Sequence, residues 1–269
     1  MRECFVALFQ QPPYHFGMRK HSAIISTLGV PSEVYGMHGG VGRAEYAVHA
    51  RRSQFIGPWE AFEWSRLPAG AVSGEHLHTR TEELYFILSG SGEMVLNGTP
   101  HDVSAGDVVV TGVGASHALR NTHRGADLTW LVIELLSPAT AQVFKEVHSG
   151  DTHSIGFEDI GGVGVTDVLS LREPGTIPSL PLSGPIEQIS RHRLVGDDSL
   201  TLRTTDHEYA VYVLAGTGTV QFGSTIKVVE KDTAICLPLG EDATFCPHGE
   251  SFELFVASMA FQPRSKGTP

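Results

Sequence analysis

Residues 70–92 read GAVSGEHLHTRTEELYFILSGSG, and residues 104–121 read SAGDVVVTGVGASHALRN. In the first stretch, one residue separates His76 from His78, and Glu83 follows; His117 lies about one β-hairpin further on. Side chains two apart on a strand point to the same face, so His76 and His78 should face together. Three imidazoles and a carboxylate brought together by antiparallel strands predict a metal site.

The sequence around these stretches alternates short apolar segments with Gly, Pro and Asn. Asn97-Gly98 is a strong hairpin signal. Regular strand spacing with turn signals is typical of an all-β sandwich or barrel. The predicted strands cover residues 59–67, 83–89, 92–97, 108–111, 117–121 and 128–136.

The flanking segments carry fewer strand signals. Ser137 is a good helix cap and Pro138 suits the first helical position, so residues 138–147 should form a helix. Residues 148–185 form a connector with one possible strand at 163–171. In the N-terminal arm, residues 23–25 could form a short strand. The glycine-rich segment 36–43 lacks the features of a nucleotide loop and is interpreted as a plain mobile loop.

The second half of the chain repeats the first. Residues 208–218, EYAVYVLAGTG, match residues 82–92, EELYFILSGSG, in character. Two further turns also correspond: Lys231-Asp232 to Gly106-Asp107, and residues 238–240 to 112–114. An internal repeat of this length predicts two copies of one β-domain.

The two motifs resemble those of the cupins. The first has Gly70, His76, His78, Glu83 and Gly90 at the family spacing; the second has Gly106, Gly112 where the family has proline, Gly114, His117 and Asn121. The likeness is close over residues 58–136 and looser over 186–262. The resemblance implies an all-β fold of two cupin (double-stranded β-helix, jelly-roll) barrels. The ligands that it implies are His76, His78, Glu83 and His117.

The resemblance also implies a domain organisation. We expect an N-terminal arm over 1–44, a metal-binding cupin domain over 45–137, a linker with a short helix over 138–185 and a second cupin domain over 186–269. In the second copy the ligand positions fall near Leu202, Thr204, Tyr209 and Ala243. His207 and Glu208 are out of register, which turns a strand side chain to the other face. We therefore expect the second barrel to be metal-free.

Other residues of the first copy have competing interpretations. Tyr85 shares a face with Glu83, so it either serves as an acid, base or substrate contact or fills the barrel. Arg66 either pairs with a substrate carboxylate or forms a surface salt bridge. Glu82, one residue from the expected ligand, should face solvent or support the site. Phe62, Phe86, Trp130 and Leu131 should pack in the core, and His15, His21, His38 and His49 receive no role.

Composition excludes several classes of protein. The net charge of −11, from 19 basic and 30 acidic side chains, argues against a nucleic-acid partner. No apolar run is long enough to cross a bilayer. Three cysteines make no disulfide framework, so a reduced, cytoplasmic compartment is expected. Exposed strand edges favour a homodimer.

The expected function is that of an enzyme acting on a small organic molecule. Four protein ligands leave two positions of an octahedral shell open, as a catalytic metal requires. We expect one divalent transition metal per chain, Fe(II) before Mn, Zn, Ni or Cu, and a non-haem dioxygenase. A non-redox isomerase, cyclase, lyase or decarboxylase is the first alternative. A small-molecule-binding cupin without turnover is the second.

Overall fold

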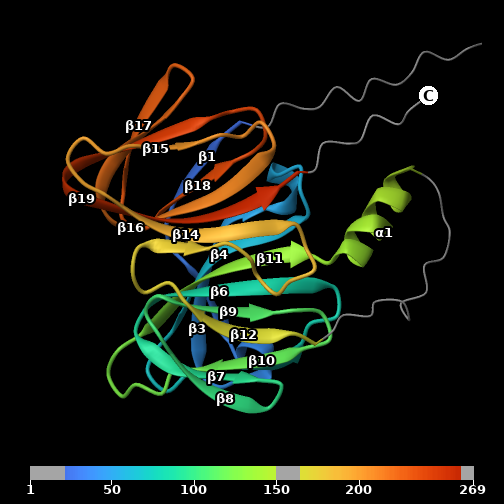
Figure 1. The fold of residues 1–269 in the computed structure, drawn as a ribbon. Helices are drawn as coiled ribbons and strands as arrows, with labels where there is room; N and C mark the ends of the chain where they lie inside the picture. Colours follow the sequence, from blue (N-terminus) through green and yellow to red (C-terminus); the bar gives the residue numbers. More distant parts are fainter. Residues whose placement is uncertain (1–21, 150–163, 262–269) are drawn as a thin grey trace, which may run out of the picture.

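Two β-barrels lie one above the other in the computed structural model, which describes residues 22–149 and 164–261 (Figure 1). The predicted all-β architecture of two cupin barrels, with an N-terminal arm and a short linking helix, is confirmed. The Asn97-Gly98 hairpin is present, with a positive φ at both residues as a two-residue turn of this type requires.

The first barrel is built from a seven-stranded and a four-stranded sheet. The larger sheet has the order β12-β9-β6-β11-β4-β3-β2, with bounds Thr166–Ser170, Asp107–Thr111, Thr81–Ser89, Leu128–Leu136, Trp59–Leu67, Arg43–Arg51 and Ser32–Tyr35. The smaller sheet has the order β5-β10-β7-β8, with bounds Val72–Leu77, Ser116–Arg120, Ser91–Leu96 and Thr99–Ser104. The two sheets face each other across the barrel interior.

One eight-stranded sheet forms the second barrel. Its main path is β1-β18-β16-β19-β14-β13, with bounds Ile24–Thr27, Thr233–Leu237, His207–Phe222, Ala243–Ala260, Ile186–Leu194 and Gly175–Ile177. β15 (Leu200–Leu202) also pairs with β19, and β17 (Thr225–Glu230) with β16. β16 and β19 are long enough to run through both faces of this barrel.

Each of the two flanking segments contributes a strand to one of the barrels. β1, from the N-terminal arm, pairs antiparallel with β18 of the second barrel, where Ile24 lies opposite Cys236. β12, which follows the linking helix, pairs with β9 of the first barrel, where Thr166 lies opposite Thr111. The strand expected over residues 163–171 is therefore present and belongs to the metal-site domain's sheet.

Strand alternation divides the apolar side chains between two layers. On β6, Tyr85 and Ile87 pack inside the first barrel, whereas Leu84 and Phe86 pack in the layer between the barrels. There the ring of Phe86 stacks on Phe255 of β19 with centroids 4.6 Å apart. Two barrels thus share one buried interface, and the inner face of β6 remains available for a site.

Short helices complete the fold. α1 (Pro138–Ser149) begins where predicted, and the Ser137 hydroxyl oxygen accepts a hydrogen bond from the backbone N–H of Thr140 at 3.2 Å. The 3-10 turns η1 (Met37–Gly39) and η2 (Arg52–Gln54) flank β3. No helix among the described residues has the length and apolar character needed to span a membrane.

Candidate metal centre

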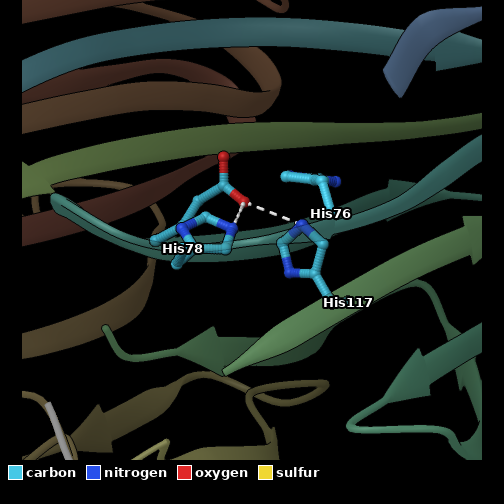
Figure 2. Close-up of side chains that lie close together, drawn as sticks. His76, His78 and His117 are labelled. Atoms are coloured by element: carbon cyan, nitrogen blue, oxygen red, sulfur yellow. Dashed lines mark ion pairs between the residues drawn. The ribbon is translucent and has the colours of Figure 1, made fainter. Parts of the chain in front are cut away.

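The structure brings together the four side chains that the motifs single out. His76 lies on β5 and His78 directly after it, His117 lies on β10, and Glu83 lies on β6 of the facing sheet. His76 and His117 are cross-strand partners in the β5–β10 pair. One ligand atom from each residue lies within 4.8 Å of the others. Figure 2 shows the three labelled histidines close together, with dashed lines from His78 and His117 to one carboxylate oxygen, which is Oε2 of Glu83.

A second set of contacts orients the three imidazole rings. The Nδ1 atoms of His76 and His78 lie 3.1 and 3.2 Å from the backbone carbonyl oxygens of Gly74 and Thr81. The Nδ1 of His117 lies 2.7 Å from the Thr111 hydroxyl. A ring that donates from Nδ1 to a carbonyl presents the Nε2 lone pair on its other side. The partners of His76 and His78 therefore favour the tautomer that a metal ligand needs.

Three buried atoms at the centre have no hydrogen-bond partner. They are His78 Nε2, His117 Nε2 and Glu83 Oε2. Glu83 Oε2 lies 3.5 Å from the first nitrogen and 3.0 Å from the second. A buried polar atom left unpaired costs roughly 1–3 kcal/mol, so three together at one point indicate an absent ligand. Nitrogen and carboxylate donors in this number fit a divalent transition metal.

Burial determines the protonation of these groups. Desolvation lowers the pKa of both His78 and His117 to about 4, so both rings are neutral at pH 7. Desolvation raises the pKa of Glu83, and the neighbouring imidazoles oppose that shift. Neutral imidazoles bind metal without first releasing a proton.

Gly112, which stands where the family has proline, has a specific contact. Its backbone N–H donates to the carbonyl oxygen of Val165 at 2.7 Å, one residue before β12 begins. Proline has no N–H and could not make this bond. The departure from the family motif thus helps dock β12 on the first barrel and leaves the ligand His117 in place.

A cavity of about 310 Å³ adjoins the centre. Glu83, Tyr85, Trp130 and Glu134 line it together with Glu63. The register explains this grouping, because Glu134 is the cross-strand partner of Glu83, and Tyr85 and Glu63 both pair with Val132 of β11. Paired residues of adjacent strands point to the same face, so all of them face the barrel interior.

Burial and mutual repulsion perturb two of the lining carboxyls. The pKa of Glu63 is raised to about 7 by desolvation and then by Glu134 and Glu83. The pKa of Glu134 is raised to about 7 by desolvation and then by Glu83 and Glu60. Groups that exchange protons near neutral pH are common in functional sites.

Tyr85 lies where the sequence predicts it, inside the barrel beside Glu83. It is buried, its side chain hydrogen-bonds Glu83, and its ring centroid is 5.0 Å from that of His117. Burial and the charge of Glu83 raise its pKa, so the phenol keeps its proton. It both fills the barrel and offers a hydrogen bond at the centre.

Arg66 and Glu82 are not part of the centre. Arg66 forms ion pairs with Glu45 and Asp127 and does not line the cavity, in line with the surface salt bridge that the sequence left open. The expectation that Glu82 faces solvent or supports the metal site is wrong. Glu82 is 2% exposed, and its carboxylate accepts hydrogen bonds from the backbone N–H groups of 183–184, on the opposite side of β6 from Glu83.

Sequence reasoning missed several cavity residues. His38, given no role, stacks on His76 with centroids 3.8 Å apart, and its Nδ1 lies 3.1 Å from the Ser73 hydroxyl. Its loop was interpreted as mobile, but the backbone of 36–42 is pinned to β5 through a bridge between Val41 and Val72. A Cβ at Gly74 would lie 2.3 Å from the carbonyl oxygen of His38, so only glycine permits this contact.

Trp130 also differs from its expected role. It packs in the core of the first barrel as predicted, but it additionally lines the cavity, and its buried Nε1 has no hydrogen-bond partner. The alternation of aromatic and branched residues on β11 gave no signal for this. Glu63 and Glu134 could have been suspected as polar residues on two strongly apolar strands, at Trp59–Leu67 and Leu128–Leu136.

The positions in the second barrel that correspond to the ligands are occupied by other types of side chain. Leu202, Tyr209 and Ala243 pack in its apolar core. Thr204 is buried, and both its backbone N–H and its hydroxyl donate to Asp242. These side chains offer no imidazole or carboxylate to a cation. That the second barrel binds no metal stays a prediction.

Comparison with known proteins gives matches to both the sequence and the fold. The family model described as "Cupin domain" matches residues 63–134. The "Oxalate-binding protein" of Thermotoga maritima is 34% identical over 106 residues, which cover 39% of this chain and 87% of that protein.

Several solved structures match nearly the whole chain, including one from E. coli and one from Bacillus subtilis. Protein Ylba from E. coli superposes with a TM-score of 0.64 at 11% identity, covering 91% of this chain and 93% of its own. Bacillus subtilis oxalate decarboxylase OxdC, as a mutant, superposes with a TM-score of 0.60 at 16% identity, covering 89% and 78%. At these identities the likeness shows the fold alone, here extending over both barrels.

Proposed function

Because the chain belongs to the cupin superfamily, we propose that it is a metal-dependent enzyme acting on a small organic molecule. His76, His78, Glu83 and His117 would hold one divalent transition metal in the first barrel. The observation that carries this proposal is the convergence of three buried, unpartnered ligand atoms beside a cavity of about 310 Å³. That volume is at the lower end of the range for small-molecule pockets.

Our first candidate reaction is non-haem Fe(II) dioxygenation. Three neutral imidazoles and one carboxylate suit Fe(II), and a bound iron would supply the activation of dioxygen beside a chelated substrate. The chain's own residues have separate tasks. Tyr85 holds a proton next to Glu83, Trp130 presents its indole N–H to the cavity, and the apolar residues of the barrel exclude water.

Non-redox proton transfer is the second candidate, and one observation favours it. The carboxyl groups of Glu63 and Glu134 line the same cavity and are partly buried. One of them would remove a proton from a substrate carbon and return it elsewhere; a metal held by His76, His78, Glu83 and His117 would supply Lewis acidity for this chemistry. An isomerase, cyclase, lyase or decarboxylase would use this arrangement. Binding without turnover, as in an oxalate-binding protein, is the remaining alternative.

Two measurements on the protein as purified test the proposal. Elemental analysis should find one equivalent of a transition metal per chain; its absence after native purification and after reconstitution would contradict the proposed function. Oxygen uptake during turnover of a candidate substrate then separates the reactions. Dioxygenation predicts stoichiometric uptake and no turnover under argon, whereas full anaerobic turnover would exclude the oxygenase and leave proton transfer.

A further inference from the structure

The cavity beside the metal centre has an unusual balance of charge. Three carboxyl groups line it, those of Glu63, Glu83 and Glu134, and no lysine or arginine of the described residues does so. His38 also lines the cavity; partial burial and the imidazoles of His76 and His117 lower its pKa to about 4, so it is uncharged at pH 7. Apart from the metal that Glu83 would help to hold, the described side chains of the walls therefore supply carboxyl acceptors and no cation.

Neighbouring basic residues do not neutralise these carboxyls. Arg51 and Arg80 act on Glu63 and Glu134, respectively, but neither lines the cavity. Arg80 forms an ion pair with Glu60 at 3.6 Å. Among the described residues, Glu63 and Glu134 take part in no hydrogen bond or ion pair, and each retains atoms open to the cavity.

The indole of Trp130 lies within this acidic wall, on the same strand and face as Glu134. Trp130 is 1% exposed and its Nε1–H has no acceptor among the described residues. A buried indole N–H normally finds a partner. The cavity lacks that partner, so an acceptor atom on a ligand fits there while the carboxyls of Glu63 and Glu134 call for a donor.

We propose that the pocket selects a small ligand that chelates the metal through an oxygen at one end and presents an amino group to Glu63 and Glu134 at the other. It discriminates against dicarboxylates, including oxalate, the ligand named for the Thermotoga maritima relative. A pocket gains specificity by repelling the wrong ligand as well as by contacting the right one, and carboxyl groups in a partly desolvated pocket repel a second carboxylate. This inference rests on the proposed metal-dependent function.

A matched ligand series tests the inference without requiring the natural substrate. Succinate, 4-hydroxybutyrate and 4-aminobutyrate share one carboxylate and a four-carbon chain and differ in the terminal group. Titration calorimetry on the metal-containing protein should show 4-aminobutyrate binding at least about tenfold more tightly than succinate, with 4-hydroxybutyrate between them. Metal content is measured on the same sample.

Variants assign the preference to the two carboxyls. In the double variant Glu63→Gln/Glu134→Gln, the ratio of the two affinities should fall from about tenfold to near unity, because amides accept and donate without charge. Glu63→Gln alone should lose part of this preference. It replaces the double variant in the test if the double variant does not retain its metal. The control Glu93→Gln removes a carboxylate that pairs with Arg120 outside the cavity, and should keep the wild-type ratio.

The outcomes separate the two levels of the argument. Protein that binds no metal overturns the proposed function. Protein that binds metal but takes succinate as well as 4-aminobutyrate, or binds neither, overturns the ligand preference and leaves the metal centre standing. If the ratio of the affinities for 4-aminobutyrate and succinate is unchanged in the double variant, other residues cause the selectivity, and the inference is also overturned.

Discussion

Glu82 and Glu208 occupy matching positions in the two copies of the repeat; Glu208 binds the chain of the first copy, and Glu82 binds the segment that leads into the second. The carboxylate of Glu82 accepts hydrogen bonds from the backbone N–H groups of 183–184, which lead into β14 of the second barrel. The carboxylate of Glu208 accepts from the backbone N–H groups of 56–57 and the indole N–H of Trp59, at the start of β4. The two barrels are thus joined by buried carboxylates.

Removing one of these carboxylates should destabilise the whole molecule. We expect Glu208→Ala to lower the free energy of unfolding by about 1–3 kcal/mol, because two buried donors and one part-buried donor lose their acceptor. Urea denaturation followed by circular dichroism measures the change. Glu230→Ala removes an exposed carboxylate of β17 and should have little effect; equal stability of the two variants would contradict the interpretation.

Loss of any metal-ligating side chain should abolish metal retention. His78→Ala and His117→Ala each leave the site with three ligands and a solvent-filled gap, and elemental analysis should find less than about a tenth of an equivalent. His101→Ala, on the exposed face of β8, is the matched control and should retain the metal. A full equivalent in His117→Ala would refute the ligand assignment.

The hydroxyl of Thr111 should matter to metal affinity although it touches no metal. Thr111→Val keeps the shape of the side chain but removes the partner of His117 Nδ1, 2.7 Å away. We expect affinity to fall by about 10–100-fold, measured by competition with a chelator. Thr129→Val breaks a hydroxyl pair with Ser89 at the surface and should leave affinity unchanged.

His49 should make stability depend on pH. It is 4% exposed between the rings of Phe62 and Tyr212, and burial lowers its pKa from 6.5 to about 4. Between those values the unfolded chain binds more protons, so stability is full above pH 6.5 and is lost as pH falls toward 4. Wild type should lose up to about 3 kcal/mol of its free energy of unfolding between pH 6.5 and 4 through this histidine, and His49→Gln should not show that loss. Parallel pH profiles of wild type and variant would rule this out.

We propose that the chain forms a homodimer through exposed strand edges. β2 is the last strand of the seven-stranded sheet, and Tyr35 on it is 74% exposed. Sheet edges and exposed aromatics favour pairing of two identical surfaces. Light scattering should give twice the chain mass of 29.0 kDa; a monomer at micromolar concentration would exclude the dimer.

The metal centre was predictable because its signal is local and periodic. His76 and His78 share a face through strand alternation alone, and motif spacing identifies Glu83 and His117. Glu82 was misplaced because alternation sends it to the other face of β6, where a backbone N–H 101 residues away in the sequence donates a hydrogen bond to its carboxylate. The sequence alone does not reveal which of two such distant segments come into contact.

His38, Glu63 and Glu134 were missed for related reasons. His38 has a φ of 52°, a left-handed backbone conformation that residues other than glycine rarely adopt. No sequence pattern therefore indicates where its ring points. Glu63 and Glu134 face the cavity only because β4, β11 and β6 pair in one particular register. A shift of one residue would turn both to the other face.

The pairing of β1 with β18 has a consequence for synthesis. Ile24 meets Cys236, 212 positions later in the chain (236 − 24). A ribosome releases β1 long before β18, so β1 waits unpaired while the residues between them emerge. Closing so long a loop is entropically costly and slow. The second barrel can therefore reach its final form only after β18 has emerged, and a nascent chain stalled before residue 233 should lack it.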